Sequence, residues 1–84
     1  MTLRILFFGP LGDVAGQEQV DIAFDPDIST IDDLRTSLTR DNAPLERALA
    51  EPQVMVALNQ QIVNWDCTLQ PGDEVAFLPP VTGG

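Results

Sequence analysis

Hydrophobic residues recur at every second position in the first part of the chain, as they do in β-strands. Residues 3–8 (LRILFF) are hydrophobic on both sides of this alternation, which is typical of a strand in the middle of a sheet. Residues 19–24 (QVDIAF) alternate more regularly with polar residues and end at a DPD turn. Residues 9–18 lie between them and carry three glycines and a proline, which predicts a loop with at most one helical turn, at residues 11–14.

The hydrophobic spacing becomes helical after residue 29. Ile31, Leu34 and Leu38 recur at i, i+3 and i+7, so they share one face of a predicted helix. Ser29 or Thr30 can serve as its N-cap, two aspartates stand in its first turn, and an arginine stands in its last. A shorter helix is predicted from residue 44 to the Glu-Pro pair at 51–52, because the residue before proline avoids helical geometry.

Strand patterns return in the last third of the chain. They cover residues 54–58 (VMVAL), a short edge strand at 62–65, and residues 74–78 (EVAFL) after a QPGD turn. Two strands, a helix and further strands, with no repeat or linker, predict an α+β fold. We expect one domain over residues 1–78, with a mixed sheet of four to five strands and one main helix packed on one face.

The pattern stops after residue 78, where the chain reads PPVTGG. Pro79 and Pro80 lack backbone N–H donors, so residues 79–84 are expected to leave the sheet as an extended, flexible tail that reaches about 20 Å. Gly83 and Gly84 have no Cβ, so the tail can enter a narrow channel with the carboxylate of Gly84 at its tip. The alternative is a frayed terminus that ends in two glycines by chance.

A hydrophobic patch beside this tail is a candidate interface. Leu78 and Ala76 alternate with the predicted core residues of the last strand. Together with Phe8, Met55 and Ala57 they are expected to form a patch on the sheet face away from the helix, suited to the core of a protein interface. The alternative is that short helices or loops cover this face.

Charge and composition exclude several classes of function. Thirteen acidic residues against four arginines give a formal charge of −9, which repels nucleic acids and anionic membranes and favours a partner with a basic face. The chain has no histidine and no lysine, so it lacks the usual general base and the Ser-His and Cys-His nucleophile pairs. Cys67 is the only cysteine, which leaves no internal disulfide and no cysteine metal cluster.

The size of the chain and its hydropathy favour a small soluble domain. Eighty-four residues suffice for one hydrophobic core but leave no room for a deep catalytic cleft. No hydrophobic run approaches the roughly 20 residues of a membrane span, and residues 1–9 lack the pattern of a signal peptide. We therefore expect a cytoplasmic protein that binds neither nucleic acid nor membrane.

Four segments stand in the order of a known family over nearly the whole chain. They are ILFFG, TIDDLRTSL, VALNQQIV and PGDEVAFLPPVTGG, of which the last is the most specific because it joins a turn, a strand and the tail. The sequence resembles the ubiquitin-like β-grasp sulfur carriers, and within them it looks most like the small subunits of molybdopterin synthase. The resemblance implies a β-grasp fold.

The same resemblance implies a chemical role for the tail. A ubiquitin-activating-like adenylating enzyme uses ATP to convert the carboxylate of Gly84 to an acyl-adenylate, and a sulfur donor protein converts that to a thiocarboxylate. The loaded tail then enters the large subunit of a heterotetrameric synthase and gives its sulfur to cyclic pyranopterin monophosphate to form the molybdopterin dithiolene. The residues expected to thread into the partner are Pro79, Pro80, Val81, Thr82 and Gly83. The chain itself is expected to bind no cofactor and to be a sulfur-donating subunit, with the catalytic groups on the large subunit.

Other functions remain open at this stage. Sulfur carriers for thiazole synthesis in the thiamine pathway share the fold and the terminal Gly-Gly, but they are usually shorter and lack a tail of the FLPPVTGG type. Ubiquitin-like modifiers use the same tail to form an amide with lysines of target proteins. A pure binding module would use the sheet face alone.

Overall fold

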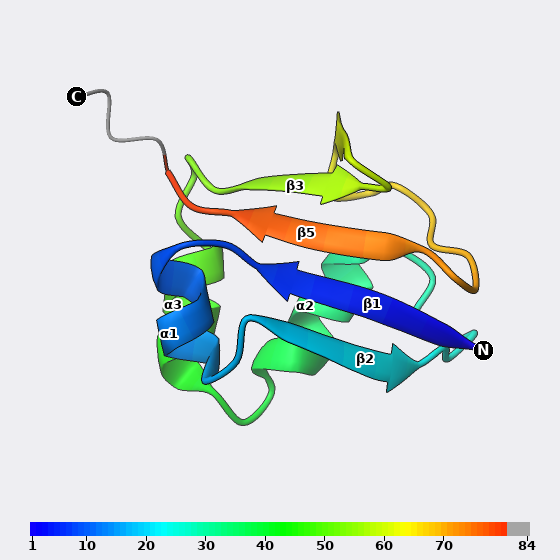
Figure 1. Cartoon of the computed structure of the whole chain (residues 1–84), viewed down its shortest axis with the longest axis horizontal. Coiled ribbons are helices and arrows are strands. Elements are labelled where there is room, and N and C mark those ends of the chain that lie inside the picture. The colour runs from blue at the N-terminus through cyan, green and yellow to red at the C-terminus, as the bar shows by residue number, and fades with distance from the viewer. Residues whose placement is uncertain (81–84) are drawn as a thin grey trace.

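Five strands form one mixed sheet in the computed structural model, which describes residues 1–80 (Figure 1). The strands are β1 (Thr2–Phe7), β2 (Gln19–Ala23), β3 (Met55–Leu58), β4 (Gln61–Val63) and β5 (Glu74–Leu78). The helices are α1 (Pro10–Ala15), α2 (Ile31–Thr39) and α3 (Ala43–Leu49). No helix within the described residues has the length and apolar character that crossing a bilayer requires. The predicted α+β class is confirmed.

β1 and β5 lie side by side in the middle of the sheet, whose order is β2-β1-β5-β3-β4. They pair in parallel, with Ile5 opposite Val75 and Phe7 opposite Phe77. β2 pairs antiparallel with the other edge of β1, and β3 pairs antiparallel with both β5 and β4. The hydrophobic residues on both faces of β1 therefore correctly predicted a central strand. β5 has the predicted bounds.

Helix α1 is longer than the single turn predicted at residues 11–14 within a loop over residues 9–18. Pro10 stands in its first turn, where the missing N–H and the fixed φ of proline suit a helix. Gly16 ends it in the left-handed conformation, with φ 82°, and donates its N–H to the Gly12 carbonyl. Leu11 is buried in the core. Glycine and proline therefore mark the two ends of a short helix here, although their density suggested an irregular segment.

A capping box begins α2. Thr30 Oγ1 accepts a hydrogen bond from the Asp33 N–H at 3.1 Å, and Asp33 Oδ2 accepts one from the Thr30 N–H at 3.2 Å. Thr30 is therefore the N-cap, while the Ser29 hydroxyl donates to the same carboxylate at 3.2 Å. These hydrogen bonds, above all the one from the Thr30 backbone, lower the pKa of Asp33 below its ordinary value.

Two helix boundaries differ from the prediction by one or two residues. Arg40 is the C-cap of α2 and lies just after its last turn. α3 begins at Ala43, because the side-chain oxygen of Asn42 accepts the Leu45 N–H at 3.1 Å and caps the helix. The helix therefore begins one residue before the predicted start at Pro44.

The edge strand β4 is shorter than predicted and excludes Trp65. It ends at Val63, and the indole of Trp65 packs over Phe77 with ring centroids 5.9 Å apart. The guanidinium of Arg35 lies 4.6 Å from the centroid of the Trp65 ring and forms an ion pair with Asp32. Trp65 therefore covers the core from the loop that follows β4 instead of extending the sheet.

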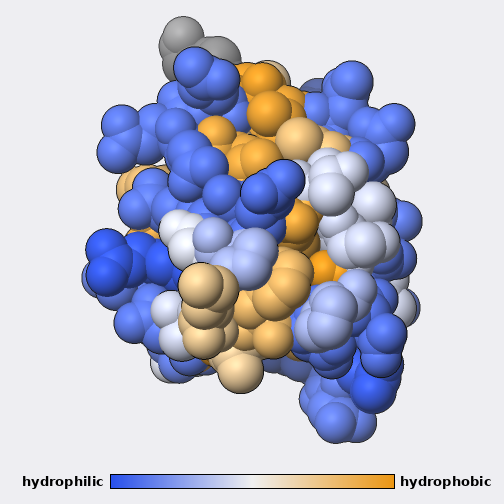
Figure 2. Space-filling model, turned by 90° about the vertical axis from the view of Figure 1, so that its right-hand side faces the viewer, coloured by the Kyte–Doolittle hydropathy of each residue, from blue (hydrophilic) through white to orange (hydrophobic). Residues whose placement is uncertain are grey.

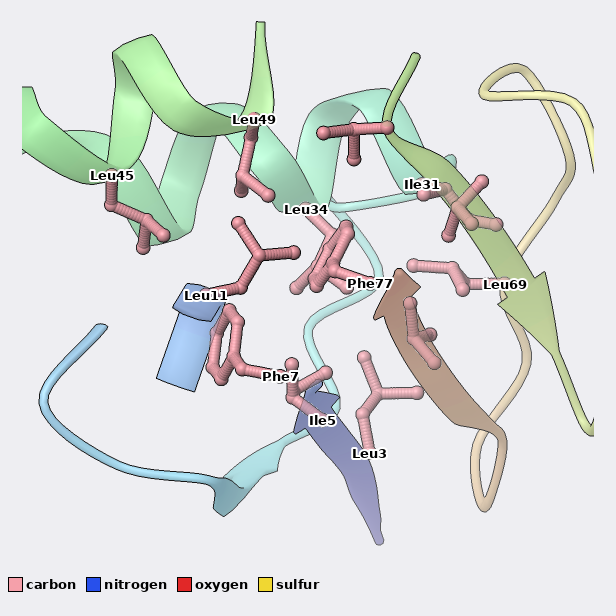
Figure 3. Close-up of a cluster of buried hydrophobic side chains, with 13 residues drawn as sticks. Leu3, Ile5, Phe7, Leu11, Ile31, Leu34, Leu45, Leu49, Leu69 and Phe77 are labelled. Carbon is pink, nitrogen blue, oxygen red and sulfur yellow. The ribbon is translucent and has the colours of Figure 1, made fainter. Parts of the chain in front are cut away.

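The core lies between one face of the sheet and the helices (Figure 3). The rings of Phe7 and Phe77 stack at its centre, with centroids 5.6 Å apart. Each large side chain that is fully buried here contributes roughly 1.5–3 kcal/mol through the hydrophobic effect. The residues labelled in Figure 3 are Leu3, Ile5, Phe7, Leu11, Ile31, Leu34, Leu45, Leu49, Leu69 and Phe77. All three described helices therefore pack on one face of the sheet or at its end, and none of them covers the opposite face.

We predict that Asp33→Asn reduces the loss of stability in acid. Because the pKa of Asp33 is lower in the folded state, its contribution is complete above about pH 4 and is lost as the pH falls through the folded-state value. Asparagine removes the charge but keeps an oxygen that can accept the same hydrogen bonds. Urea denaturation at neutral pH and at about pH 3 should show a smaller change in the free energy of unfolding for the variant.

The control is Asp41→Asn, at an exposed aspartate just after α2. It should lose as much stability in acid as the unaltered protein. An Asp33→Asn variant with the full acid sensitivity of the unaltered protein would contradict the role of the capping box.

Candidate functional site

The site predicted from the sequence begins where β5 ends. Pro79 follows Leu78 and has no N–H to donate, so the ladder between β5 and β3 stops at the Met55–Leu78 pair. Pro79 and Pro80 are half-buried. β5 delivers the chain to the end of the sheet opposite the N-terminus (Figure 1). The rest of the predicted tail lies outside the described residues: Val81, Thr82, Gly83 and Gly84.

Gly9 allows the loop after β1 to lie against the start of the tail. A Cβ at Gly9 would stand 3.3 Å from Cγ of Pro79, and the φ of 57° favours glycine. The Phe8 N–H donates to the Phe77 carbonyl at 3.1 Å, which extends the contact between the two central strands by one residue. β1 and its following loop therefore set the direction in which the chain leaves the sheet.

The predicted hydrophobic residues do share the sheet face away from the helices. Leu78 pairs with Met55, and Ala76 pairs with Ala57, across the β3–β5 ladder. Phe8 lies beside the end of β5 on the same face, because side chains alternate along the strand. Phe8 and Met55 are 46% and 47% exposed, while Leu78 is half-buried and the two alanines are buried among larger neighbours. Within residues 1–80, no helix or loop covers Phe8 and Met55.

Two further hydrophobic residues on this face were missed by the sequence analysis. Leu6 lies opposite Ala76 in β1 and β5, and Ile62 lies opposite Ala57 in β3 and β4. Ile62 is 54% exposed. The alternation of β1 already contained the signal for Leu6, whereas the face of Ile62 depends on the pairing register of a three-residue strand.

We call these residues together the apolar patch. Most of them line a shallow hollow of about 430 Å³, with Gln60 and Glu74 at its edge. The hollow is open and its floor is made of alanines, so it suits a protruding hydrophobic side chain better than an enclosed small molecule. The apolar patch consists of Leu6, Phe8, Met55, Ala57, Ile62, Ala76 and Leu78.

Polar residues occupy the other end of the same sheet face. Arg4 lies opposite Glu74, and its Nε is 3.6 Å from Oδ1 of Asp21, with both side chains more than half exposed. Figure 2 views the molecule from the end near the N-terminus and shows hydrophilic side chains on both sides of a hydrophobic strip. The apolar patch therefore lies at the tail end of this face, and the charged residues lie toward the other end, where Glu74 borders the patch.

The described residues contain few groups for catalysis. No cluster of three or more His, Cys, Asp or Glu side chains in residues 1–80 is arranged to hold a metal ion. Cys67 is half-buried, and its Sγ lies 3.9 Å from the Thr68 carbonyl oxygen. The chain contains no histidine that could activate a hydroxyl or a thiol. The described part of the site presents a hydrophobic surface beside the start of the tail.

Family comparison covers both parts of this site. Residues 5–84 match the model of the ThiS family. The chain belongs to the ThiS family. The matched range includes β5, the apolar patch and the whole tail.

Relatives of this ThiS-family chain match it over almost their entire lengths. The molybdopterin synthase sulfur carrier subunit of Escherichia coli strain K12 is 35% identical over 82 residues, which cover 98% of this chain and 99% of that protein. The subunit of the same name from Haemophilus influenzae is 32% identical with the same coverage.

Solved structures share the fold. A chain in the complex of subunits 1 and 2 of molybdopterin-converting factor from Helicobacter pylori is 27% identical, with a TM-score of 0.67 and coverage of 100% of both chains. Small archaeal modifier protein 1 of Haloferax volcanii is 26% identical, with a TM-score of 0.80 and coverage of 95% of this chain and 98% of that chain. The ubiquitin-like β-grasp fold that the resemblance implied is confirmed.

We predict that Gly9→Ala destabilises the protein more than Gly16→Ala does. Both positions have positive φ, but an added Cβ meets nothing within 4 Å at Gly16, whereas at Gly9 it meets Pro79. Gly9→Ala should lower the free energy of unfolding by about 1–3 kcal/mol. Urea denaturation measures both effects.

Hydrogen exchange of the Phe8 amide shows whether Gly9→Ala destabilises the protein by displacing Pro79 or only by straining the backbone at residue 9. This amide is bonded to Phe77, directly before the tail. Its exchange should accelerate in Gly9→Ala and stay unchanged in Gly16→Ala. Equal stability losses with unchanged Phe8 exchange would show that Gly9 does not position the tail.

Proposed function

We propose that this chain is the sulfur-carrier subunit of molybdopterin synthase, with the carboxylate of Gly84 as its reacting group. The observation that carries the proposal is the 35% identity, over essentially the full length, to the Escherichia coli subunit of that name. The arrangement of the fold supports it, because β5 ends beside an exposed hydrophobic surface and continues into PPVTGG. A chain without histidine or lysine fits the role of a macromolecular co-substrate.

The chemistry follows from the low reactivity of a carboxylate. A carboxylate oxygen of Gly84 attacks the α-phosphate of ATP on an adenylating enzyme and releases pyrophosphate. The acyl-adenylate that results is electrophilic at carbon, so hydrosulfide delivered by a donor protein attacks that carbon, the bond to the departing AMP breaks, and a thiocarboxylate is left. The thiocarboxylate sulfur is then transferred to cyclic pyranopterin monophosphate, and water restores the carboxylate. ATP is used by the adenylating partner and is not a cofactor of this chain.

The receiving partner is the large subunit of the synthase, in a heterotetramer. The relative from Helicobacter pylori was solved as a complex of subunits 1 and 2, which supports this partner. The apolar patch supplies an interface core in which Phe8 and Leu78 adjoin the tail, so docking on the patch aims the tail at the active site of the large subunit. The formal charge of −9 favours a basic docking face. ATP-dependent loading and a single cysteine fit a cytoplasmic location.

A protein-modifier role is the second candidate. The specific observation in its favour is the likeness to small archaeal modifier protein 1. Modification would join Gly84 to a lysine of another protein through an amide, whereas sulfur transfer regenerates the free carboxylate. A third candidate function is sulfur carriage for thiazole synthesis, which would use the same adenylation and thiocarboxylate steps. Both relatives described above, however, are molybdopterin synthase sulfur carrier subunits.

Deletion of Gly84 tests the proposed reacting group. We predict that the shortened chain is not adenylated, because its tail is one residue too short to bring the carboxylate into the active site of the adenylating enzyme. Its melting temperature should be unchanged, because the tail contributes little to folding stability. ATP–pyrophosphate exchange with the adenylating enzyme measures the first effect, and thermal denaturation measures the second. A shortened chain that supports exchange at the normal rate would contradict the role of Gly84.

The variant Leu78→Asp tests the apolar patch. We predict that it weakens binding to the large subunit by at least about 2 kcal/mol, because it places a charge at the centre of the interface. Ala23→Asp is the matched control, since Ala23 is exposed at the end of β2 away from the tail and receives the same charge. Isothermal titration calorimetry gives both affinities. Equal affinities of the two variants for the large subunit would show that Leu78 is not part of the interface.

A further inference from the structure

A second apolar surface lies on the other side of the tail. Leu78 points to the open sheet face, so Pro79, the next residue in an extended chain, points to the opposite side, toward Gly9 and α1. There the start of the tail lines one side of an open groove of about 420 Å³, whose other sides are lined by α1 and the end of α3. We call this the tail-base groove; it is lined by Pro10, Leu11, Val14, Ala48, Pro79 and Pro80, with Glu51 at its rim.

The tail-base groove is distinct from the apolar patch in position and composition. The patch is made by strands β1, β3, β4 and β5, whereas the groove is made by two helices and two prolines. Only one charged side chain, Glu51, lines the groove, and that side chain is exposed. The two surfaces lie on either side of the same point of exit, so the described end of the tail has hydrophobic neighbours on both sides.

The position of the groove determines what can cover it. Four residues follow Pro80, and they span at most about 14 Å when extended. A partner that encloses these residues in a channel must therefore bring the mouth of the channel close to Pro79 and Pro80, which are walls of the groove. A second copy of this chain is a poor occupant, because it brings a further charge of −9 and its own Glu51.

We propose that the tail-base groove receives a hydrophobic side chain from the mouth of the channel in the large subunit, and that a lysine or arginine beside that side chain faces Glu51. This inference rests on the proposed function and adds to it a second contact, on the helix side of the tail. Contacts on both sides of the tail restrict its direction more than contacts at the apolar patch alone would. This restriction favours insertion of the terminus into the channel.

The first test places a polar side chain in the groove. Glutamine is a good helix former, so Ala48→Gln should project a longer polar side chain into the groove while α3 stays folded. Ala50→Gln is the matched control, because Ala50 is exposed just after α3 and does not line the groove. Calorimetric titration with the large subunit should show that Ala48→Gln raises Kd by about tenfold, while Ala50→Gln stays within about twofold.

The second test reverses the charge at the rim. Glu51→Lys and Asp66→Lys change the net charge equally, and both side chains are exposed, but only Glu51 lines the groove. Glu51→Lys should raise Kd by several-fold more than Asp66→Lys, and this difference should shrink at high salt. Equal effects of the two substitutions would contradict the proposed cation opposite Glu51.

The outcomes separate this inference from the proposed function. If Ala48→Gln binds the large subunit as tightly as the unaltered chain, while Leu78→Asp does not, the groove has no role and the proposed function stands. If the unaltered chain itself fails to bind the large subunit, both the proposed function and the groove proposal are contradicted. If Ala48→Gln instead abolishes self-association detected by sedimentation, the occupant is a second copy and the proposal is wrong.

Discussion

The parallel pairing of β1 and β5 is the constraint on which the rest of the molecule depends. It brings residues from near the two ends of the chain together in the middle of the sheet, with Phe7 opposite Phe77. Because the strands run in the same direction, Phe8 and Leu78 arrive at the same end of the sheet. The core, the apolar patch and the point where the tail leaves are therefore positioned by a single register. A shift of one residue would turn Phe77 out of the core and Leu78 into it.

The two faces of the sheet differ in what they contact. One face packs against the helices, with the rings of Phe7, Phe77 and Trp65 stacked through the core. The other face bears charged residues near the N-terminus and hydrophobic residues near the tail. The core therefore lies on one face, and the proposed recognition surfaces are the other face and the groove beside the tail. This division agrees with the proposed function, in which the chain supplies a reactive end and its partners supply the catalytic groups.

Much of this arrangement was predictable from the sequence. Alternation over residues 74–78 located β5 and the opposite orientations of Phe77 and Leu78, and the helical spacing of Ile31 and Leu34 located α2. These features are local, because the period of the pattern specifies which side chains share a face. The resemblance to sulfur carriers added the chemistry of the tail, which no periodicity contains.

The errors came from features that depend on contacts distant in sequence. The glycines and the proline of residues 9–18 predict a loop with a single turn, but Leu11 gains enough burial in the core to stabilise the longer helix α1. Alternation alone does not assign Ile62 to the apolar patch, because the face of a short edge strand depends on its pairing with β3. The tail-base groove could not be foreseen, since it forms only where α1, α3 and the residues after β5 meet.

The proposed function is tested most directly by following the mass of the intact chain through one reaction cycle. The protein is first activated with ATP, the adenylating enzyme and the sulfur donor, and is then mixed with the large subunit and cyclic pyranopterin monophosphate. Sulfur carriage predicts a gain in mass equal to one oxygen-to-sulfur exchange at Gly84, followed by return to the original mass as molybdopterin appears. Release of sulfide without a pterin product, or an amide bond to a target lysine as the only product, would contradict it.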